Sequence, residues 1–254
     1  MRVTERLRHA VYSAYYAARS LNYPSSDGHD GDSYGCGYGY PIKKTVGGIS
    51  FRSYELYNLH GNDPLLRRLL RRLDAGDVFY DVGANVGVYS CAAAACGATV
   101  HAFEPNPKAC EKARANFKAN GFGCAAHSYA LSDTDGRSTF HVSSYPEVSS
   151  LHREKATVSG GRVVRSTESE TRRLDTVVGE PLPSPDHLKV DVEGAGVDVL
   201  RGAERTLAEA EPTVYFEPHG NAASARRILK AKGYRIKEIG NEDKSGFTAE
   251  PNSV

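Results

Sequence analysis

The sequence predicts an α/β fold in which a mainly parallel β-sheet is covered by helices on both faces. From residue 78 onward, apolar strand-like segments alternate with helical segments, a pattern typical of parallel sheets with helical crossovers. A turn of small residues at 83–87 joins the first of these strands to the first of these helices. The last two expected strands, 234–239 and 246–250, have no helix between them. We therefore expect the final strand to run antiparallel to its neighbours.

The first 60 residues are expected to form an appendage to a main domain of residues 61–254. Residues 2–20 have apolar side chains at helical spacing and arginines off that stripe, so we expect a helix packed across the domain or a partner chain. Contact with an anionic membrane surface is the less favoured alternative. Residues 23–41 are rich in glycine and tyrosine and predict a long loop. Residues 42–52 predict a β-hairpin that turns at Gly47 and Gly48.

Capping residues mark two helices of the main domain. Asp63 precedes Pro64 and predicts a helix start, and Asn106 precedes Pro107 in the same way. Gly121 ends the second of these helices. The expected strands are 78–82, 98–103, 124–131, 138–142, 187–192 and 213–217, and the expected helices are 87–96, 107–120, 173–178, 197–210 and 221–232. Residues 144–170 are polar and are expected to form loop and extended pieces.

The helix that begins at Pro64 has leucines on one side and four arginines on the other, at positions 67, 68, 71 and 72. We expect these arginines to form a solvated helix face. Phosphate binding is the alternative interpretation.

Composition limits the classes of protein to consider. The chain has 254 residues, of which 40% are hydrophobic and 25% charged, with a formal net charge of +1. This balance is ordinary for a soluble globular protein. It disfavours a nucleic-acid partner, because domains that bind nucleic acids are usually clearly basic. No apolar run approaches the roughly 18 residues of a transmembrane helix. The five cysteines lack C-x-x-C spacing, so we expect reduced thiols, a cytoplasmic protein and no metal.

The turn after strand 78–82 carries most of the information about function. Gly83 and Gly87 let the backbone approach a ligand where a Cβ atom would collide, and the following helix presents free N–H groups to an anion. Glu104 ends the next strand, 21 residues after Gly83. A carboxylate at such a distance accepts hydrogen bonds from ribose hydroxyls. The unit therefore predicts an adenosine-containing ligand.

The details of the turn favour one adenosine derivative. Gly83-x-x-x-Gly87 differs from the G-x-G-x-x-G pattern that cradles a pyrophosphate. With Asn85 inside the turn and Asp81 before it, the turn suits S-adenosyl-L-methionine, which has an ammonium, a carboxylate and no phosphate. Asp81 would serve the cationic end and the Gly87 end would serve the carboxylate. The alternatives are a nicotinamide or flavin nucleotide, and glycines needed only for close packing.

From about residue 50 to 250 the chain resembles the FkbM-type S-adenosylmethionine-dependent methyltransferases, within the Rossmann-like methyltransferase superfamily. The matching segments are 81–87 (DVGANVG), 103–106 (FEPN), 130–136 (ALSDTDG), 188–194 (LKVDVEG) and 200–203 (LRGA). The resemblance implies a seven-stranded sheet with its last strand antiparallel. It also implies methyl transfer, typically to a hydroxyl oxygen of a sugar or natural product.

The resemblance also suggests roles for single residues. It implies that Glu104 holds the ribose and that Leu131, Ser132 and Asp133 flank the adenine. One position departs from the family pattern. An acidic residue usually opens the helix after the Glu–Gly pair, but here Gly196 takes that place and Asp198 follows two residues later.

Several titratable residues are expected at the carboxyl ends of the strands, where open α/β sheets bind ligands. They are Asp81, Glu104, Asp133, Asp191, Glu193, Glu217 and His219. An alcohol acceptor must lose its proton as it is methylated, and Asp191, Glu193 and His219 are the candidate catalytic residues. Asp191 is favoured for orienting the acceptor, with a loop-stabilising hydrogen bond as the alternative. His219 could titrate near neutral pH, and a surface histidine in a turn is its alternative.

The predicted function is S-adenosylmethionine-dependent O-methylation of a sugar, glycan or other small molecule by in-line transfer. A nucleotide-dependent oxidoreductase is disfavoured because G-x-G-x-x-G is missing. A non-catalytic domain that binds a ligand or partner is a third possibility. Acceptor recognition is expected in residues 23–60 and 144–170.

Overall fold

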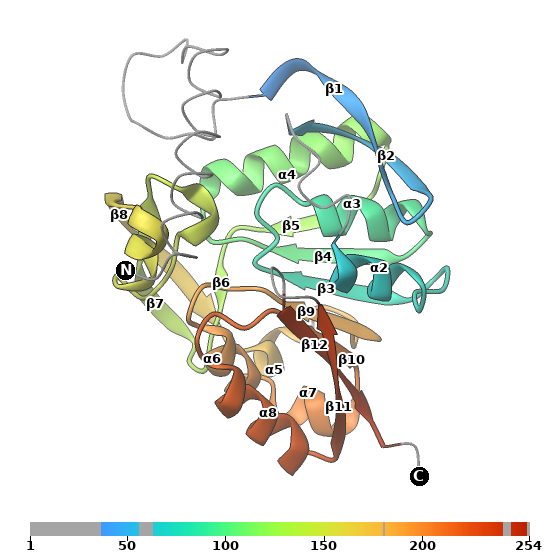
Figure 1. The fold of residues 1–254 in the computed structure, drawn as a ribbon, viewed down its shortest axis with the longest axis vertical. Helices are drawn as coiled ribbons and strands as arrows, with labels where there is room; N and C mark the ends of the chain where they lie inside the picture. Colours follow the sequence, from blue (N-terminus) through green and yellow to red (C-terminus); the bar gives the residue numbers. More distant parts are fainter. Residues whose placement is uncertain (1–36, 56–62, 180, 241–244, 253–254) are drawn as a thin grey trace.

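A seven-stranded sheet forms the centre of the protein. The computed structural model describes residues 37–55, 63–179, 181–240 and 245–252. The strand order in the sheet is β11-β12-β10-β9-β3-β4-β5. Its strands are β3 (Val78–Val82), β4 (Thr99–Phe103), β5 (Ala125–His127), β9 (His187–Val190), β10 (Thr213–Phe216), β11 (Tyr234–Gly240) and β12 (Ser245–Pro251). The strand β12 lies between β10 and β11 and is antiparallel to both (Figure 1). The predicted fold class, including its antiparallel last strand, is confirmed.

Helices cover both faces of this sheet (Figure 1). One face packs against α2 (Pro64–Leu70), α3 (Val88–Ala95) and α4 (Pro107–Asn120), and the other packs against α5 (Leu174–Val177), α6 (Gly196–Arg201), α7 (Glu204–Glu209) and α8 (Ala222–Ala231). A hydrophobic core lies on each face of the sheet. Neighbouring residues of a strand point to opposite faces, so that Phe79 packs in the core of the first face and Tyr80 in the core of the second. None of the described helices has the length and apolar composition needed to cross a membrane.

The predicted caps are present. Asp63 Oδ1 accepts hydrogen bonds from the backbone N–H groups of Leu65 and Leu66 at the start of α2. Asn106 Oδ1 accepts one from Lys108 at the start of α4. Gly121 ends α4 in the left-handed conformation. These local signals worked because each is satisfied within a few residues of the cap.

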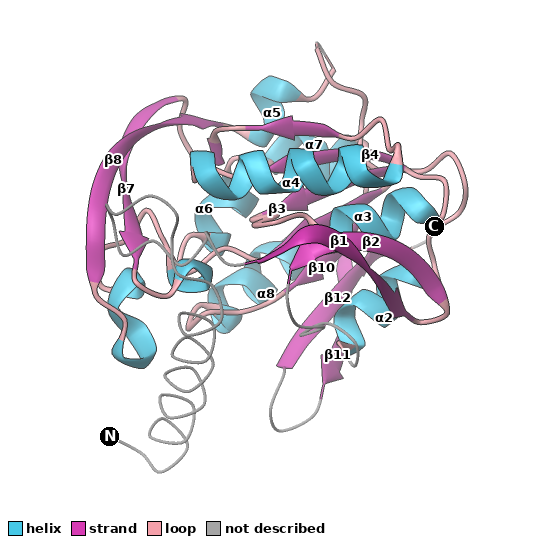
Figure 2. Ribbon diagram, turned by 90° about the horizontal axis from the view of Figure 1, so that it is seen from above, coloured by secondary structure: helices cyan, strands magenta, loops and turns pink. Residues whose placement is uncertain are grey.

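The predicted hairpin consists of β1 (Gly37–Val46) and β2 (Ile49–Glu55), turning at Gly47 and Gly48. It lies across α3 and α4 (Figure 2). The strand β1 begins earlier than expected, so 37–41 are strand rather than loop. Gly37 at the start of this extension pairs with Glu55 of β2, and the register of the two strands is irregular between Gly37 and Ile42. The predicted helix 2–20 and the loop up to residue 36 lie outside the described residues, and the domain boundary at residue 60 stays a prediction.

The predicted strand 124–131 is wrong, because the chain divides it between two sheets. The strand β5 belongs to the main sheet, whereas β6 (Ala130–Leu131) joins β7 (Gly136–Ser143) and β8 (Val163–Arg172) in a small three-stranded sheet. The polar segment 144–170 was expected to form loop and extended pieces, without a defined strand. Pairing with β7 along most of its length makes β8 a strand. Two 3₁₀ segments, η2 (Pro146–Val148) and η3 (Lys155–Gly160), lie between β7 and β8.

The predicted helix 197–210 is two helices, α6 and α7, with a break at Gly202. At this point the backbone of Gly202 passes against the segment that follows β6. A Cβ atom on Gly202 would lie 1.9 Å from the carbonyl oxygen of Ser132. The long-range contact with Ser132 coincides with the interruption, and Gly202 was the one local signal of it within 197–210.

Candidate functional site

The candidate site lies at the carboxyl ends of β3, β4, β9 and β10. The strand β3 pairs with β4 on one side and with β9 on the other, so the chain winds outward in opposite directions from this point. Ligands of open α/β sheets bind at such a reversal. The predicted residues Asp81, Glu104 and Asp191 all lie at these strand ends.

The turn that follows β3 is built on close backbone contacts. Gly83, Asn85 and Gly87 have φ of 77°, 51° and 78°, in the left-handed region. A Cβ atom on Gly83 would lie 1.9 Å from the carbonyl oxygen of Asp191, and one on Gly87 would lie 2.8 Å from Cε1 of Phe117. Packing therefore requires both glycines, whatever ligand the turn accepts.

Glu104 is tied to both sides of this turn. Its Oε2 accepts a hydrogen bond from the backbone N–H of Asn85 at 2.9 Å, and its Oε1 accepts one from Asn106 at 2.8 Å. Burial raises the pKa of Glu104 to about 7, although the two backbone hydrogen bonds favour its ionised form. Each carboxylate oxygen can accept a further hydrogen bond. Glu104 thus braces the turn and keeps capacity for ligand hydroxyls.

Asn85 offers a second acceptor at the turn. Its Oδ1 is buried and has no hydrogen-bond partner within the described part of the chain. Buried polar atoms are nearly always paired, so this oxygen fits a ligand that brings its own donor. S-adenosylmethionine carries ribose hydroxyls and an ammonium, so the free acceptors of Asn85 and Glu104 are compatible with it.

A buried lysine joins the ends of β3 and β9. Lys189 Nζ lies 3.0 Å from Oδ1 of Asp81 and 3.3 Å from Oδ2 of Asp191, and it donates to the carbonyl of Gly83 at 3.2 Å. The other oxygen of Asp81 accepts hydrogen bonds from the N–H and hydroxyl of Ser90. Burial disfavours the ammonium, but the charges of Asp81 and Asp191 outweigh it and raise the pKa of Lys189.

Lys189 is not among the site residues predicted from the sequence. A lysine within the predicted strand 187–192 was the available signal, because an unpaired charge is rarely buried in a strand. Asp81 is fully buried and both of its oxygens are occupied. Its established contacts are therefore internal, and its contact with a ligand stays a prediction.

The three candidate catalytic residues lie side by side. His219 Nε2 is 2.9 Å from Oδ1 of Asp191, and His219 Nδ1 is 3.1 Å from Oε1 of Glu193. Burial opposes the charged ring, but hydrogen bonds to the two carboxylates raise the pKa of His219 to about 10. His219 is therefore an imidazolium at neutral pH, with both N–H groups donating.

The pKa values of Asp191 and Glu217 are shifted in opposite directions by the charges around them. Burial opposes ionisation of Asp191, yet Lys189 and His219 hold its pKa well below the usual range. The negative charge of Asp191, together with burial, raises the pKa of Glu217 to about 7. Among the described residues, Asp191, Glu217 and His219 each offer one possible metal-ligand atom, all within 4.8 Å of one another. Lys189 and protonated His219 already supply two positive charges beside Asp191.

The segment between β7 and β8 lies against the ion-pair cluster of Lys189, Asp191, Glu193 and His219. Ser150 Oγ donates to the carbonyl of Glu193, and Lys155 Nζ donates to the carbonyl of His219 at 3.1 Å. The Lys155 chain lies over Gly194, where a Cβ atom would come within 2.6 Å of its Cγ. Part of the segment 144–170, predicted to recognise the acceptor, thus lies beside the candidate catalytic loops.

Asp198, which follows the departure at Gly196, faces this segment too. Its Oδ2 is 3.4 Å from Nε2 of His152, and its Oδ1 is 3.1 Å from Nη1 of Arg201. Asp198 therefore connects α6 to the loop before η3.

The residues predicted to flank an adenine lie on β6 and the turn after it. Leu131 is buried in the core with Phe103, and the backbone N–H of Ser132 donates to the carbonyl of Arg172. Ser132 Oγ lies 3.4 Å from Oδ1 of Asp133. Within the described residues no hydrogen bond joins these three to Glu104 or Asp191. Their role beside a ligand stays a prediction.

Comparison with known proteins points to one family. The profile of the methyltransferase FkbM domain matches residues 81–236. The chain is 28% identical over 169 residues to hexuronic acid methyltransferase AglP of Haloferax volcanii, covering 66% of this chain and 67% of that protein. It is 31% identical over 198 residues to 31-O-demethyl-FK506 methyltransferase FkbM of Streptomyces tacrolimicus, covering 65% and 75%.

Solved structures share the fold. A methyltransferase FkbM from Methylobacillus flagellatus KT aligns with a TM-score of 0.52 at 16% identity, over 73% of this chain and 48% of that one. The 16S rRNA N2 G1207 methyltransferase of T. thermophilus, in complex with AdoMet and guanosine, aligns with a TM-score of 0.54 at 13% identity, over 84% and 50%. The chain spans about half the length of both proteins.

Proposed function

Because the chain belongs to the FkbM methyltransferase family, we propose that it transfers a methyl group from S-adenosyl-L-methionine to a hydroxyl oxygen of a sugar, glycan or other small molecule. One observation carries the proposal. The turn that carries the free acceptors of Asn85 and Glu104 lies beside the ion-pair cluster around His219. The close contact of Gly83 with the backbone of Asp191 joins the two. A donor-binding turn and a set of proton-handling groups thus share one edge of the sheet.

The donor would be held by the turn and by β4. Glu104 would accept hydrogen bonds from the ribose hydroxyls, and Asn85 Oδ1 would accept one from another donor group of the ligand. Leu131, Ser132 and Asp133 would flank the adenine, as the family resemblance implies. When bound there, S-adenosylmethionine supplies an electrophilic methyl carbon on a sulfonium.

The acceptor would be oriented by Asp191 and Glu193. A histidine with a pKa of about 10 and both ring nitrogens donating is a poor proton acceptor at neutral pH. We assign His219 the role of holding the two carboxylates in place. Glu217, with a pKa of about 7, is tuned for accepting the hydroxyl proton, because a base works best when its pKa is near the operating pH.

The segment around Lys155 would form the wall of the acceptor site. Its ammonium lies at the carbonyl of His219, where a carboxylate on the acceptor would find a counter-charge. The relative named for hexuronic acid methylation supports testing uronic acids first. Lys155→Met is expected to raise the KM for a uronic acid about tenfold, and to leave the KM for a neutral sugar unchanged.

The donor is tested by titration calorimetry of the full chain with S-adenosylmethionine and, separately, with NADH. We expect heat from the first and none from the second. The reverse result would favour the oxidoreductase alternative.

The reaction is tested by release of S-adenosylhomocysteine over a panel of uronic acids, neutral sugars and glycosides. Glu217→Gln is expected to keep donor affinity and to lower kcat at least about a hundredfold, with the exposed Glu111→Gln as control. Donor binding without release on any acceptor would favour a non-catalytic domain. Normal turnover in Glu217→Gln would remove Glu217 from the mechanism.

A further inference from the structure

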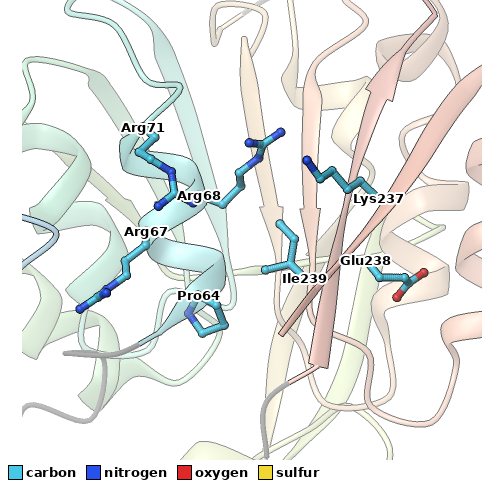
Figure 3. A pocket seen from close by; sticks show the side chains of 7 residues that line it. All are labelled: Pro64, Arg67, Arg68, Arg71, Lys237, Glu238 and Ile239. Atoms are coloured by element: carbon cyan, nitrogen blue, oxygen red, sulfur yellow. The ribbon is translucent and has the colours of Figure 1, made fainter. Parts of the chain in front are cut away.

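A groove of about 280 Å³ lies between α2 and β11, and no residue of the ion-pair cluster lines it (Figure 3). Arg67, Arg68 and Arg71 line it from the helix, and Lys237 and Glu238 line it from the strand. The arginines were expected to form a solvated helix face. The fold changes their setting, because it brings a lysine from about 170 positions later in the chain to the opposite wall.

The carboxylates near the groove are already neutralised. Glu238 forms a two-pronged pair with Arg226, at 2.9 and 2.8 Å. Glu250 binds Arg68 at 3.1 Å and Arg72 at 2.8 Å. The positive charges of the groove are therefore in excess over the acids that face or adjoin it.

The described residues include no such partner for two cations of the groove. Within the described part of the chain, neither Arg71 nor Lys237 takes part in an ion pair or side-chain hydrogen bond. Figure 3 shows the guanidinium of Arg68 and the ammonium of Lys237 extending into the space between helix and strand from opposite sides. The electrostatic repulsion between two such cations is reduced when an anion lies between them.

Arg68 adds a separate observation. Its Nη2 donates to Glu250, but its Nε is buried and has no acceptor within the described residues. A buried donor without a partner costs on the order of 1–3 kcal/mol. An oxygen that enters the groove could supply the missing acceptor.

We propose that this groove binds a phosphate group, as a phosphate monoester or a diphosphate. Guanidinium forks match the spacing of phosphate oxygens, and an ammonium adds a point charge. The volume suits one or two phosphates rather than a whole nucleotide, since sites for drug-sized ligands span roughly 300–1,000 Å³. The source of the phosphate is a soluble phosphorylated compound or a lipid headgroup. The proposal does not depend on the acceptor of the methyl group.

The test is titration calorimetry of the full chain with pyrophosphate at physiological salt. Arg71→Gln/Lys237→Gln removes the two unpaired cations, and both side chains are exposed, so we expect the variant to fold. Lys118→Gln/Arg165→Gln, at exposed positions on α4 and β8, removes the same charge elsewhere. The first variant should bind pyrophosphate at least about tenfold more weakly, and the second should match the wild type.

A second variant is expected to act in the opposite direction. Glu238→Gln removes the acid that lines the groove and should tighten pyrophosphate binding severalfold. Absence of pyrophosphate binding to the wild type at millimolar concentration would overturn the proposal. So would equal weakening in the two double variants, because general surface charge would then explain the binding.

Vesicles distinguish the source of the phosphate. Sedimentation with phosphatidylcholine vesicles that contain phosphatidic acid, competed by pyrophosphate and lost in Arg71→Gln/Lys237→Gln, would indicate a lipid headgroup. Pyrophosphate binding without such sedimentation would indicate a soluble compound.

Discussion

Replacing Gly83 by alanine tests whether the contact between β3 and β9 organises the candidate site. A Cβ atom at this position would lie 1.9 Å from the carbonyl oxygen of Asp191 and 2.9 Å from its carbonyl carbon. Since Cβ contacts below 3.0 Å are essentially not tolerated, one of the two backbones must move by about 1 Å. The movement would strain hydrogen bonds of Gly83 to Phe103 and of Asp191 to Val82, both 3.0 Å long.

A second glycine separates the cost of the steric contact at position 83 from the cost of the left-handed backbone conformation. Gly121 has φ of +70°, close to the +77° of Gly83, but a Cβ atom on it would meet nothing within 4 Å. Gly121→Ala should therefore cost only the left-handed strain, about 1–2 kcal/mol. Gly83→Ala should add an overpacking cost of about 1–3 kcal/mol and so total about 2–5 kcal/mol.

Urea unfolding followed by circular dichroism measures both variants against the wild type. We expect Gly83→Ala to lose about 1–3 kcal/mol more of the unfolding free energy than Gly121→Ala. Equal losses would refute the packing argument, because they would show that only the backbone conformation matters. Calorimetry with S-adenosylmethionine on the same variants should show weaker binding in Gly83→Ala alone.

Three further perturbations test the charged groups. His219 has a folded pKa of about 10, above its ordinary 6.5, so its contribution to stability is complete below pH 6.5 and is lost as pH rises through 10. Urea unfolding should show a decline of up to about 5 kcal/mol over this window that His219→Gln lacks. Parallel profiles for both proteins would contradict the assigned ion pairs. Glu104 has a pKa of about 7 and would accept donor hydroxyls best when ionised, so affinity for S-adenosylmethionine should rise through pH 7. Calorimetry should find this rise in Glu217→Gln but not in Glu104→Gln, and its survival in Glu104→Gln would dissociate Glu104 from the donor. Lys189→Met leaves two carboxylates without their cation and should destabilise by about 3–5 kcal/mol. Adding Asp81→Asn should restore part of that loss in thermal unfolding, and a purely additive double variant would argue against their pairing.

Elements with local signals were predicted well. The turn between β3 and α3, the position of Glu104 after β4 and the caps of α2 and α4 each depend on residues close together in the chain. Local preference and tertiary structure agree in these segments, so the pattern of residue types was sufficient.

Elements shaped by distant partners were not predicted. The division of 124–131 follows from the pairing of β6 with β8, and the break at Gly202 coincides with its contact with Ser132, 70 positions earlier. Polar residues of β8 form a strand because β7 supplies hydrogen-bond partners. In each case the deciding contact is absent from the local sequence.

The candidate site likewise has features that the sequence predicts and features that depend on tertiary contacts. Residue types and spacing along the chain were enough to select Asp191, Glu193 and His219 as neighbours at strand ends. The fold alone decided that His219 donates to both carboxylates and that Lys189 reaches Asp81, 108 positions away in the chain. Charge states depend on burial and on which opposite charge lies within a few ångströms, and these distances exist only once the sheet has formed.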